Sequence, residues 1–287
     1  MKPQRYRRRR IEENTFKFLM YFSFLLVTSS LGFILLTVLV KGLPAMNWAM
    51  VSQTPKGGYY LGKEGGILNA IIGSLYLAGG GTLLALLVSL PLALFMEVYA
   101  QRSRLANLIR LSLDVLWGIP SIVYGAFGFI IMLSLNMRSS LLGGIIVLAL
   151  LELPIMVRAM DEVIRLTPPD LEAASLALGA TRLETAIHVV ARQVLPGIAT
   201  AILLAFGRGI GDAASVLFTA GYTDRIPTSL LRPAASLPLA VFFQLNTPFP
   251  EVQQRAYAAA LILTLIVLAI SLGSRWIAGR LGKYAVK

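Results

Sequence analysis

Six long apolar stretches constrain the fold of this chain more than any other feature. They lie at about 16–40, 67–97, 108–135, 141–157, 196–219 and 256–276. A helix needs about 20 consecutive apolar residues to cross the hydrocarbon core of a membrane. Only 14% of the residues are charged, whereas a soluble domain carries roughly 25%. The sequence therefore predicts an all-α, polytopic membrane protein with six transmembrane helices.

The residue inventory excludes several kinds of site. The sequence contains no cysteine and a single histidine, His188, so it offers neither thiolate ligands nor a multi-histidine metal cluster. We expect no metal and no cofactor. The net charge of +12 would suggest nucleic acid in a soluble protein, but basic residues also mark the cytoplasmic loops of membrane proteins. We therefore interpret the charge as a topology signal and expect no nucleic-acid partner.

Basic residues are distributed unevenly between the two sides of the predicted bundle. The segments on one side hold 18 Lys and Arg residues and the opposite loops hold 7. The richer segments are 1–17, 98–110, 158–192 and 275–287. Because cytoplasmic loops carry the excess of Lys and Arg, this asymmetry predicts that both termini are cytoplasmic.

The same pattern divides the chain into four parts. We predict a basic cytoplasmic arm at 1–17, a first transmembrane helix with an external loop at 18–66, a core domain at 67–276 and a cytoplasmic tail at 277–287. The first apolar run is longer than the apolar region of a secretory signal. We therefore interpret it as a retained helix.

A cytoplasmic segment at about 158–195 is strongly patterned. Thr167, followed by prolines, predicts the N-cap of a short alanine-rich helix, and Gly179 predicts the end of that helix. Thr181 and Glu184 have the spacing of a second capping box, which predicts another helix running towards the fifth stretch. Two capped helices joined by a glycine turn favour a docking surface. The alternative is a packed hairpin without a partner.

Two ionisable residues lie inside the fifth apolar stretch. Arg208 and Asp212 are four residues apart, so on a helix they share a face and can pair. Ionisable groups at membrane depth are functional by default. The alternating glycines around them permit either close packing or a helix break, and the free N–H groups of a broken helix favour an anion. We predict a substrate pathway here, lined also by Glu152 of the fourth stretch. The alternative is a neutralised structural ion pair.

Two other motif matches are incomplete. The run at 209–212 resembles the Gly-x-Gly-Asp signature of presenilin-like intramembrane aspartyl proteases, which need a second aspartate in a Tyr-Asp context. The available candidate, Asp114, follows a leucine, so protease function is much less favoured. The run at 57–64 resembles a phosphate-binding loop, but Glu64 occupies the position of the required Ser or Thr. We predict no nucleotide site there.

The patterned segment carries a family resemblance. It resembles the EAA loop of bacterial ABC importer permeases through Glu172, Ala173 and Ala174, then Gly179, then Leu195 and Pro196. In that family the loop forms a coupling helix that docks into a cleft of the ATPase subunit. The resemblance implies that Glu172, Ala173, Ala174 and Gly179 couple this chain to an ATP-binding subunit.

Further segments are similar to phosphate-specific permeases of the PstA type. These segments are 65–71, 120–125, 153–158, 165–169, 177–182 and 217–220. The resemblance implies a non-catalytic permease subunit of an ATP-driven phosphate importer in the bacterial inner membrane. It implies four further partners: a second permease in a heterodimer, ATP-binding ABC subunits, an extracytoplasmic phosphate-binding protein and membrane lipid.

The fifth stretch departs from that family's pattern. The family commonly reads Arg-x-x-Gly-Glu-Thr, whereas this chain has Arg208, Gly211, Asp212 and Ala213. Asp212 keeps the negative charge of the family's glutamate on a shorter side chain. Ala213 lacks the hydroxyl of the family's threonine. A permease for another oxyanion, such as tungstate, molybdate or sulfate, is therefore the alternative reading.

Overall fold

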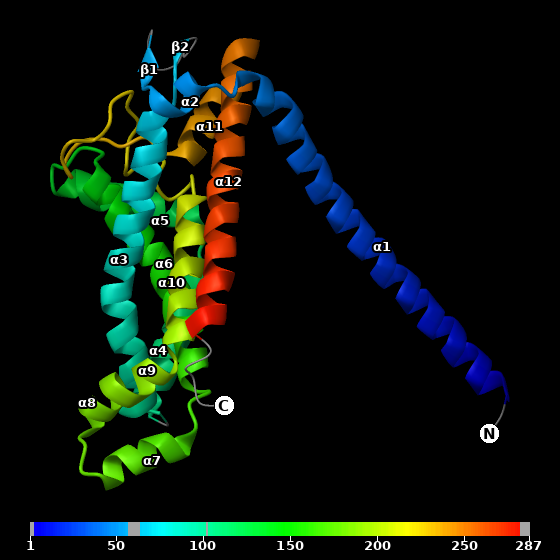
Figure 1. Ribbon diagram of the computed structural model, residues 1–287, viewed down its shortest axis with the longest axis vertical. Coiled ribbons are helices and arrows are strands. Elements are labelled where there is room, and N and C mark those ends of the chain that lie inside the picture. Colours follow the sequence, from blue (N-terminus) through cyan, green and yellow to red (C-terminus); the bar gives the residue numbers. More distant parts are fainter. Residues whose placement is uncertain (1–2, 57–63, 102, 282–287) are drawn as a thin grey trace.

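The computed structural model describes residues 3–56, 64–101 and 103–281, and nearly all of its regular structure is helical (Figure 1). The helices are α1 (Pro3–Gly42), η1 (Leu43–Ala45), α2 (Trp48–Ser52), α3 (Leu68–Val98), α4 (Arg104–Gly118), α5 (Ser121–Ser134), α6 (Leu141–Ile164), α7 (Pro169–Ala177), α8 (Arg182–Glu184), η2 (Thr185–Val190), α9 (Ala191–Gln193), α10 (Leu195–Ile210), α11 (Leu237–Leu245) and α12 (Pro250–Leu281). Two short strands, β1 (Pro55–Lys56) and β2 (Glu64–Gly65), pair antiparallel. The phosphate-loop-like run lies mostly at 57–63, outside the described residues.

The centre of the bundle is the pair α3 and α6, with α10 packed against both helices. Glycines bring the two long helices close together. A Cβ added to Gly144 on α6 would lie 2.6 Å from Leu77 Cδ2, and one added to Gly80 on α3 would lie 2.6 Å from Ile145 Cδ1. Small residues at such crossings let membrane helices approach closely, which maximises van der Waals contact. The functional residues described below lie on this three-helix unit and on the segments that follow α6 and α10.

Four described helices are long and apolar enough to cross a membrane, and two bent helix pairs raise the number to six if each pair counts as one span. One bent pair corresponds to the stretch predicted at 108–135. It divides into α4 and α5, which meet at 99°. Ile119 is extended and Pro120 precedes the first residue of α5. Proline disfavours helical backbone in the residue before it, which explains the break.

The span predicted at 196–219 is wrong in its second half. Helix α10 ends at Ile210, and the chain from Gly211 to Ser236 contains no regular helix. This irregular segment is held by the bundle at the start of α6: the Ser140 N–H donates to the Thr219 carbonyl and the Leu141 N–H donates to the Arg232 carbonyl. Non-helical backbone at membrane depth is tolerated where protein surrounds it.

Helix α1 stands away from the other helices over most of its length (Figure 1). It meets the bundle at its C-terminal end, where a Cβ added to Gly42 would lie 2.7 Å from the Tyr257 carbonyl oxygen of α12. The apolar window of this helix has 0% of its residues buried. Helix α1 is therefore peripheral to the packed core.

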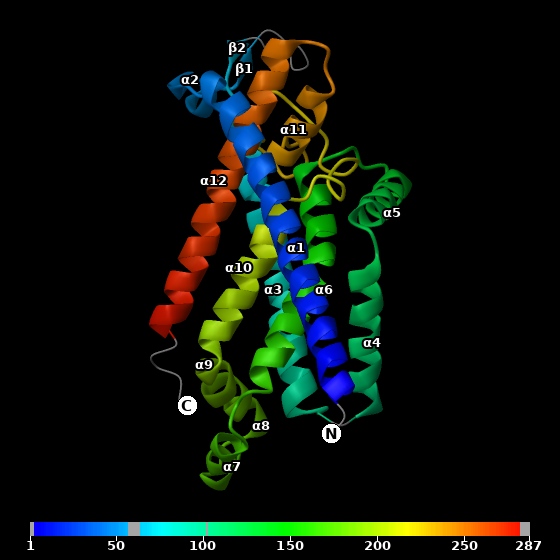
Figure 2. The same ribbon diagram turned by 90° about the vertical axis from the view of Figure 1, so that its right-hand side faces the viewer.

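The two ends of the bundle carry different elements (Figures 1 and 2). Helices α7, α8 and α9 lie at the end where α1 begins and α12 finishes. Helices α2 and α11 lie towards the opposite end, together with the small sheet. The segments predicted to be cytoplasmic are thus gathered at one end of the molecule.

Candidate functional site

Arg208 and Asp212 form the predicted pair, although the helix ends between them. The Arg208 Nη1 atom lies 3.5 Å from Asp212 Oδ1, which is beyond normal hydrogen-bond length. The Asp212 side chain is 5% exposed, whereas the Arg208 side chain is 50% exposed. The pair is therefore a loose ion contact that leaves guanidinium donors free on the open face of α10.

Asp212 also shapes the chain that follows α10. Its Oδ2 atom accepts a hydrogen bond from the Ser215 N–H at 2.8 Å. Aspartate side chains compete with helical hydrogen bonding in this way and favour turns. Together with the glycine at position 211, this contact explains why the helix stops at Ile210. Of the two possibilities that the glycines left open, close packing or a break, the structure shows a break at this point.

Glu152 occupies a different environment from Arg208. Its side chain is 0% exposed, and its Oε2 atom accepts a hydrogen bond from Thr82 Oγ1 on α3 at 2.7 Å. The same carboxyl lies against Gly209 of α10. In this conformation Glu152 is thus enclosed by three helices, and its place in a substrate pathway stays a prediction.

The acid required by the protease alternative has another partner. The Asp114 carboxylate on α4 accepts a hydrogen bond from Arg158 Nε of α6 at 2.9 Å, whereas the Asp212 carboxylate contacts Arg208 and Ser215. A catalytic aspartate dyad needs two carboxylates that share a proton. The structure does not bring these two together. Across the described ranges there is also no group of three or more His, Cys, Asp or Glu residues placed to hold a metal ion.

Helix α7 is the predicted coupling helix, and it is exposed. It contains Glu172, Ala173 and Ala174, and none of its residues is buried. Gly179 ends the turn after it with φ +88°, a left-handed conformation that glycine adopts without strain. The predicted glycine stop is confirmed.

The predicted Thr167 cap is wrong. Pro168 occupies the N-cap position of α7 without a side-chain hydrogen bond, and Pro169 begins the helix. The Thr167 hydroxyl is buried without a partner. Proline at the first position of a helix is favoured because its missing N–H is not needed there. The tandem prolines thus start the helix one residue beyond the reach of the Thr167 side chain.

Helices α7 to α9 form the hairpin. Its second half begins as predicted and then departs from an α-helix. Thr181 and Glu184 form a complete capping box, in which the Thr181 N–H donates to Glu184 Oε2 at 2.8 Å. The chain then widens into the π-helical turn η2. The Ser175 and Thr185 hydroxyls, 2.9 Å apart, link α7 to this turn.

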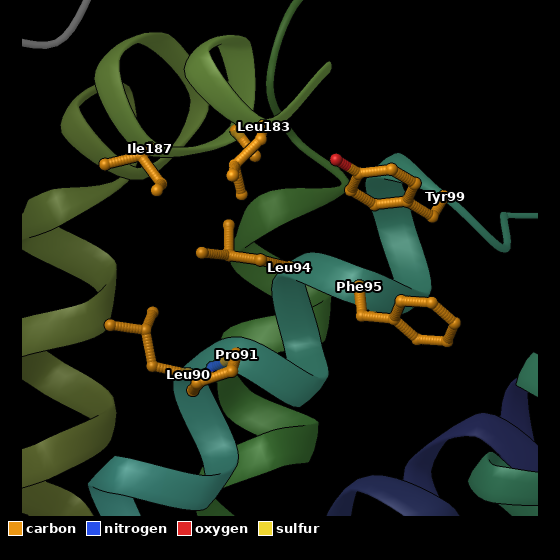
Figure 3. A pocket seen from close by; sticks show the side chains of 8 residues that line it. Leu90, Pro91, Leu94, Phe95, Tyr99, Leu183 and Ile187 are labelled. Carbon is orange, nitrogen blue, oxygen red and sulfur yellow. The ribbon is translucent and has the colours of Figure 1, made fainter. Parts of the chain in front are cut away.

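An apolar pocket of about 500 Å³ separates this turn from the end of α3 (Figure 3). Leu183 and Ile187 face it from the hairpin, and Leu90 and Leu94 face it from α3. Beside the pocket, Ala186 is buried. On the hairpin side, the residues that line this pocket are therefore apolar.

A buried charge network ties the start of the hairpin to three membrane helices. Arg110 of α4 donates to Glu97 of α3 at 2.5 Å and to Asp161 of α6 at 3.1 Å. Arg165, four residues before α7, donates to the same two acids at 3.0 Å each. Sequence analysis missed this network. Apart from the pair Arg165 and Asp161, which are four residues apart, its bonded members are 13 to 68 residues apart along the chain, so no local pattern signals the network as a whole.

Comparison with known proteins agrees with this architecture. Residues 89–283 match the family described as "Binding-protein-dependent transport system inner membrane component". This match covers more than half of the chain, and the chain belongs to that family. It is a multi-pass membrane protein and a permease subunit of an ABC importer.

Relatives of similar length carry a more specific name. A "Phosphate transport system permease protein PstA" of Haemophilus influenzae is 33% identical over 90% of this chain and 90% of its own. A "Phosphate transport system permease protein PstA 1" of Mycobacterium tuberculosis is 32% identical over 94% of this chain and 90% of its own. A "Probable ABC transporter permease protein YqgI" of Bacillus subtilis is 30% identical over 84% and 86%, respectively.

A solved structure shares the fold. It is an inward-facing form of the MetNI methionine ABC transporter, with a TM-score of 0.59 and 18% sequence identity. The similarity covers 75% of this chain and 95% of the MetNI chain. The permease fold expected from the EAA-loop resemblance is confirmed.

Proposed function

We propose that this chain is the permease subunit of an ATP-driven phosphate importer. The observation that carries this proposal is the half-exposed Arg208 guanidinium on a membrane helix, held loosely by Asp212. The names of the relatives support phosphate as the transported anion.

Arg208 has the chemistry that phosphate transport requires. A phosphate ion that crosses the membrane must exchange its water for protein hydrogen-bond donors. Arginine stays charged and presents a planar set of donors that matches phosphate oxygens. The 3.5 Å contact with Asp212 orients the guanidinium and lowers its net attraction for anions. That balance suits a permease, because a site that binds too tightly does not release its substrate.

The open face of Arg208 also supports a partner permease. An ionised guanidinium is strongly disfavoured against lipid and in membrane proteins faces a cavity or another polar group. We therefore place the pathway between this face of α10 and a second permease subunit. The heterodimer predicted from the sequence is the arrangement we propose.

The coupling helix supplies the connection to ATP. We propose that α7, with Glu172, Ala173, Ala174 and Gly179, docks into an ATP-binding subunit that hydrolyses ATP. Closure of the ATP-binding subunits displaces α7. The charge network at Arg165 passes this displacement to α3, α4 and α6. The pathway then alternates between inward and outward access.

The remaining proposals concern orientation and location. We propose that both termini and α7 to α9 are cytoplasmic, in a bacterial inner membrane, because basic residues concentrate on that side. An extracytoplasmic phosphate-binding protein docks at the opposite end, near α2 and α11. We keep the four-part division at 17, 66 and 276 as the proposed domain boundaries.

A second candidate substrate class rests on one observation. This chain has Asp212 and Ala213 where the phosphate permeases commonly have glutamate and threonine. A shorter carboxylate and a missing hydroxyl can favour another tetrahedral oxyanion, such as sulfate, tungstate or molybdate.

Reconstitution decides between these substrates. The complex of the two permeases and the ATP-binding subunits is placed in proteoliposomes with the binding protein outside and ATP inside. We expect uptake of labelled phosphate that depends on ATP and resists excess sulfate, tungstate and molybdate. Uptake of one of those ions in place of phosphate would transfer the proposal to it, and uptake without ATP would contradict an ABC permease.

A further inference from the structure

The Glu152 carboxyl is buried at the junction of three helices. It lies near the middle of α6 and its side chain is 0% exposed. Thr82 of α3 and Gly209 of α10 both contact it. A glutamate so completely enclosed is unusual, because charged side chains are almost never fully buried unless they are paired.

The two oxygens of Glu152 have different neighbours. Oε2 accepts a hydrogen bond from Thr82 Oγ1 at 2.7 Å. Oε1 has no hydrogen-bond partner and contacts the backbone of α10: a Cβ added to Gly209 would lie 1.8 Å from it. Only glycine at position 209 leaves room for this oxygen.

No described cation neutralises Glu152. The other charged groups on these three helices are Glu97 on α3, Arg158, Asp161 and Glu162 on α6, and Arg208 on α10. Glu97 and Asp161 pair with Arg110 and Arg165, Arg158 pairs with Asp114, and Arg208 pairs with Asp212. Glu162 is ten residues along the same helix, roughly 15 Å away.

We infer that Glu152 carries its proton in this conformation and acts as a neutral positioning residue, which holds Gly209 and therefore the adjacent Arg208 in place. An isolated carboxylate in a dry interior is strongly disfavoured relative to the neutral acid. One hydroxyl donor from Thr82 does not replace a counter-charge. The neutral carboxyl instead fills the space beside Gly209. It therefore fixes the position of α10 along its axis relative to α3 and α6.

Infrared spectroscopy of the assembled complex tests the protonation directly. A carboxylic acid C=O group absorbs at a higher frequency than a carboxylate, so the difference between wild type and Glu152→Gln isolates this one group. We expect a protonated band that is lost in Glu152→Gln and is present at neutral pH, where a glutamate in water is ionised. Thr82→Val removes the hydrogen-bond donor and should move that band without abolishing it. A carboxylate band in its place would overturn the inference.

Transport tests the positioning role, and this readout alone rests on the proposed function. Glu152→Gln keeps the size and neutrality of the side chain, so we expect at least fivefold more uptake than for Glu152→Ala and the pH profile of the wild type. Glu152→Ala leaves a gap beside Gly209 and should lower uptake at least tenfold in complexes that still assemble. Loss of uptake in an assembled Glu152→Gln complex would contradict the positioning role.

The two proposals fail separately. If the reconstituted complex does not transport phosphate while the protonated band is present, the substrate proposal fails and the protonation of Glu152 stands. If phosphate uptake is normal and the band is that of a carboxylate, the protonation of Glu152 fails and the substrate proposal stands. The Thr82→Val spectrum provides the same information if Glu152→Gln does not assemble, because it needs only a shift of the wild-type band.

Discussion

At the scale of single residues, the proposed anion site depends on how Arg208 is held. Its guanidinium is half exposed and lies 3.5 Å from a carboxylate that is itself fixed by the Ser215 N–H. Asp212 therefore restrains the arginine without occupying all of its donors. The sequence predicted the pair from the four-residue spacing. It did not predict the hydrogen bond from the Ser215 N–H to Asp212, because this bond forms where the chain leaves the helix.

Substitutions of Arg208 should show whether uptake needs only its positive charge or also its planar set of donors. Lysine keeps the charge but lacks the planar set of donors, so we expect Arg208→Lys to lose uptake by about tenfold or more. Arg208→Gln removes the charge and should abolish uptake, while Asp212→Asn should impair it less. Uptake into proteoliposomes, with assembly checked by co-purification, measures all three. Full activity of Arg208→Lys would argue against phosphate recognition by the guanidinium.

At the scale of elements, the hairpin from α7 to α9 shows which features a sequence reveals. The capping box at Thr181 and the turn at Gly179 were predicted correctly, because both depend on residues within a few positions. The π-helical turn was not predicted, because it depends on how the hairpin packs. The Thr167 cap was predicted wrongly, because the neighbouring prolines start the helix instead.

Longer-range features were also beyond the sequence. Pro120 predicts a kink in its span, but the angle of 99° between α4 and α5 does not follow from the sequence. The charge network around Arg110 and Arg165 joins three helices whose residues are far apart in the chain. Such contacts depend on tertiary packing, which periodicity does not report.

Gly179 offers a test of the coupling element. Its φ of +88° strains a β-branched side chain by about 1–3 kcal/mol, although nothing lies within 4 Å of an added Cβ. Gly179→Val should therefore distort the turn after α7 and uncouple ATP hydrolysis from uptake. Gly179→Asn is the matched control, because asparagine tolerates left-handed backbone, and it should keep most coupling. The two activities are measured in the same proteoliposomes, and normal uptake by the valine variant would count against the role of α7.

At the scale of the whole molecule, the two ends of the bundle carry different elements. Helices α7 to α9 and the basic segments share one end, and α2 and α11 lie towards the other (Figures 1 and 2). Helix α1 touches the bundle mainly at α12, so most of its apolar surface must meet lipid or another subunit. Six apolar stretches were enough to predict this class of protein, because the hydropathy of a residue does not depend on tertiary packing.

Cysteine labelling measures the orientation on a background without native cysteines. Ser52→Cys on α2 should react with an impermeant thiol reagent added to intact cells from outside. Ser175→Cys on α7 should react only after the membrane is dissolved in denaturing detergent. Detergent treatment of both variants provides the control for reactivity. The reverse pattern would overturn the cytoplasmic assignment of the termini and of α7.

The most direct test of the central claim is phosphate uptake by the double variant Arg208→Gln, Asp212→Asn. If the pair is only structural, removing both charges leaves nothing unpaired, and transport should recover relative to Arg208→Gln. If Arg208 is the anion-binding group of the pathway, the double variant should be as inactive as Arg208→Gln. We predict no recovery in complexes that co-purify intact, and recovered phosphate uptake would contradict the account.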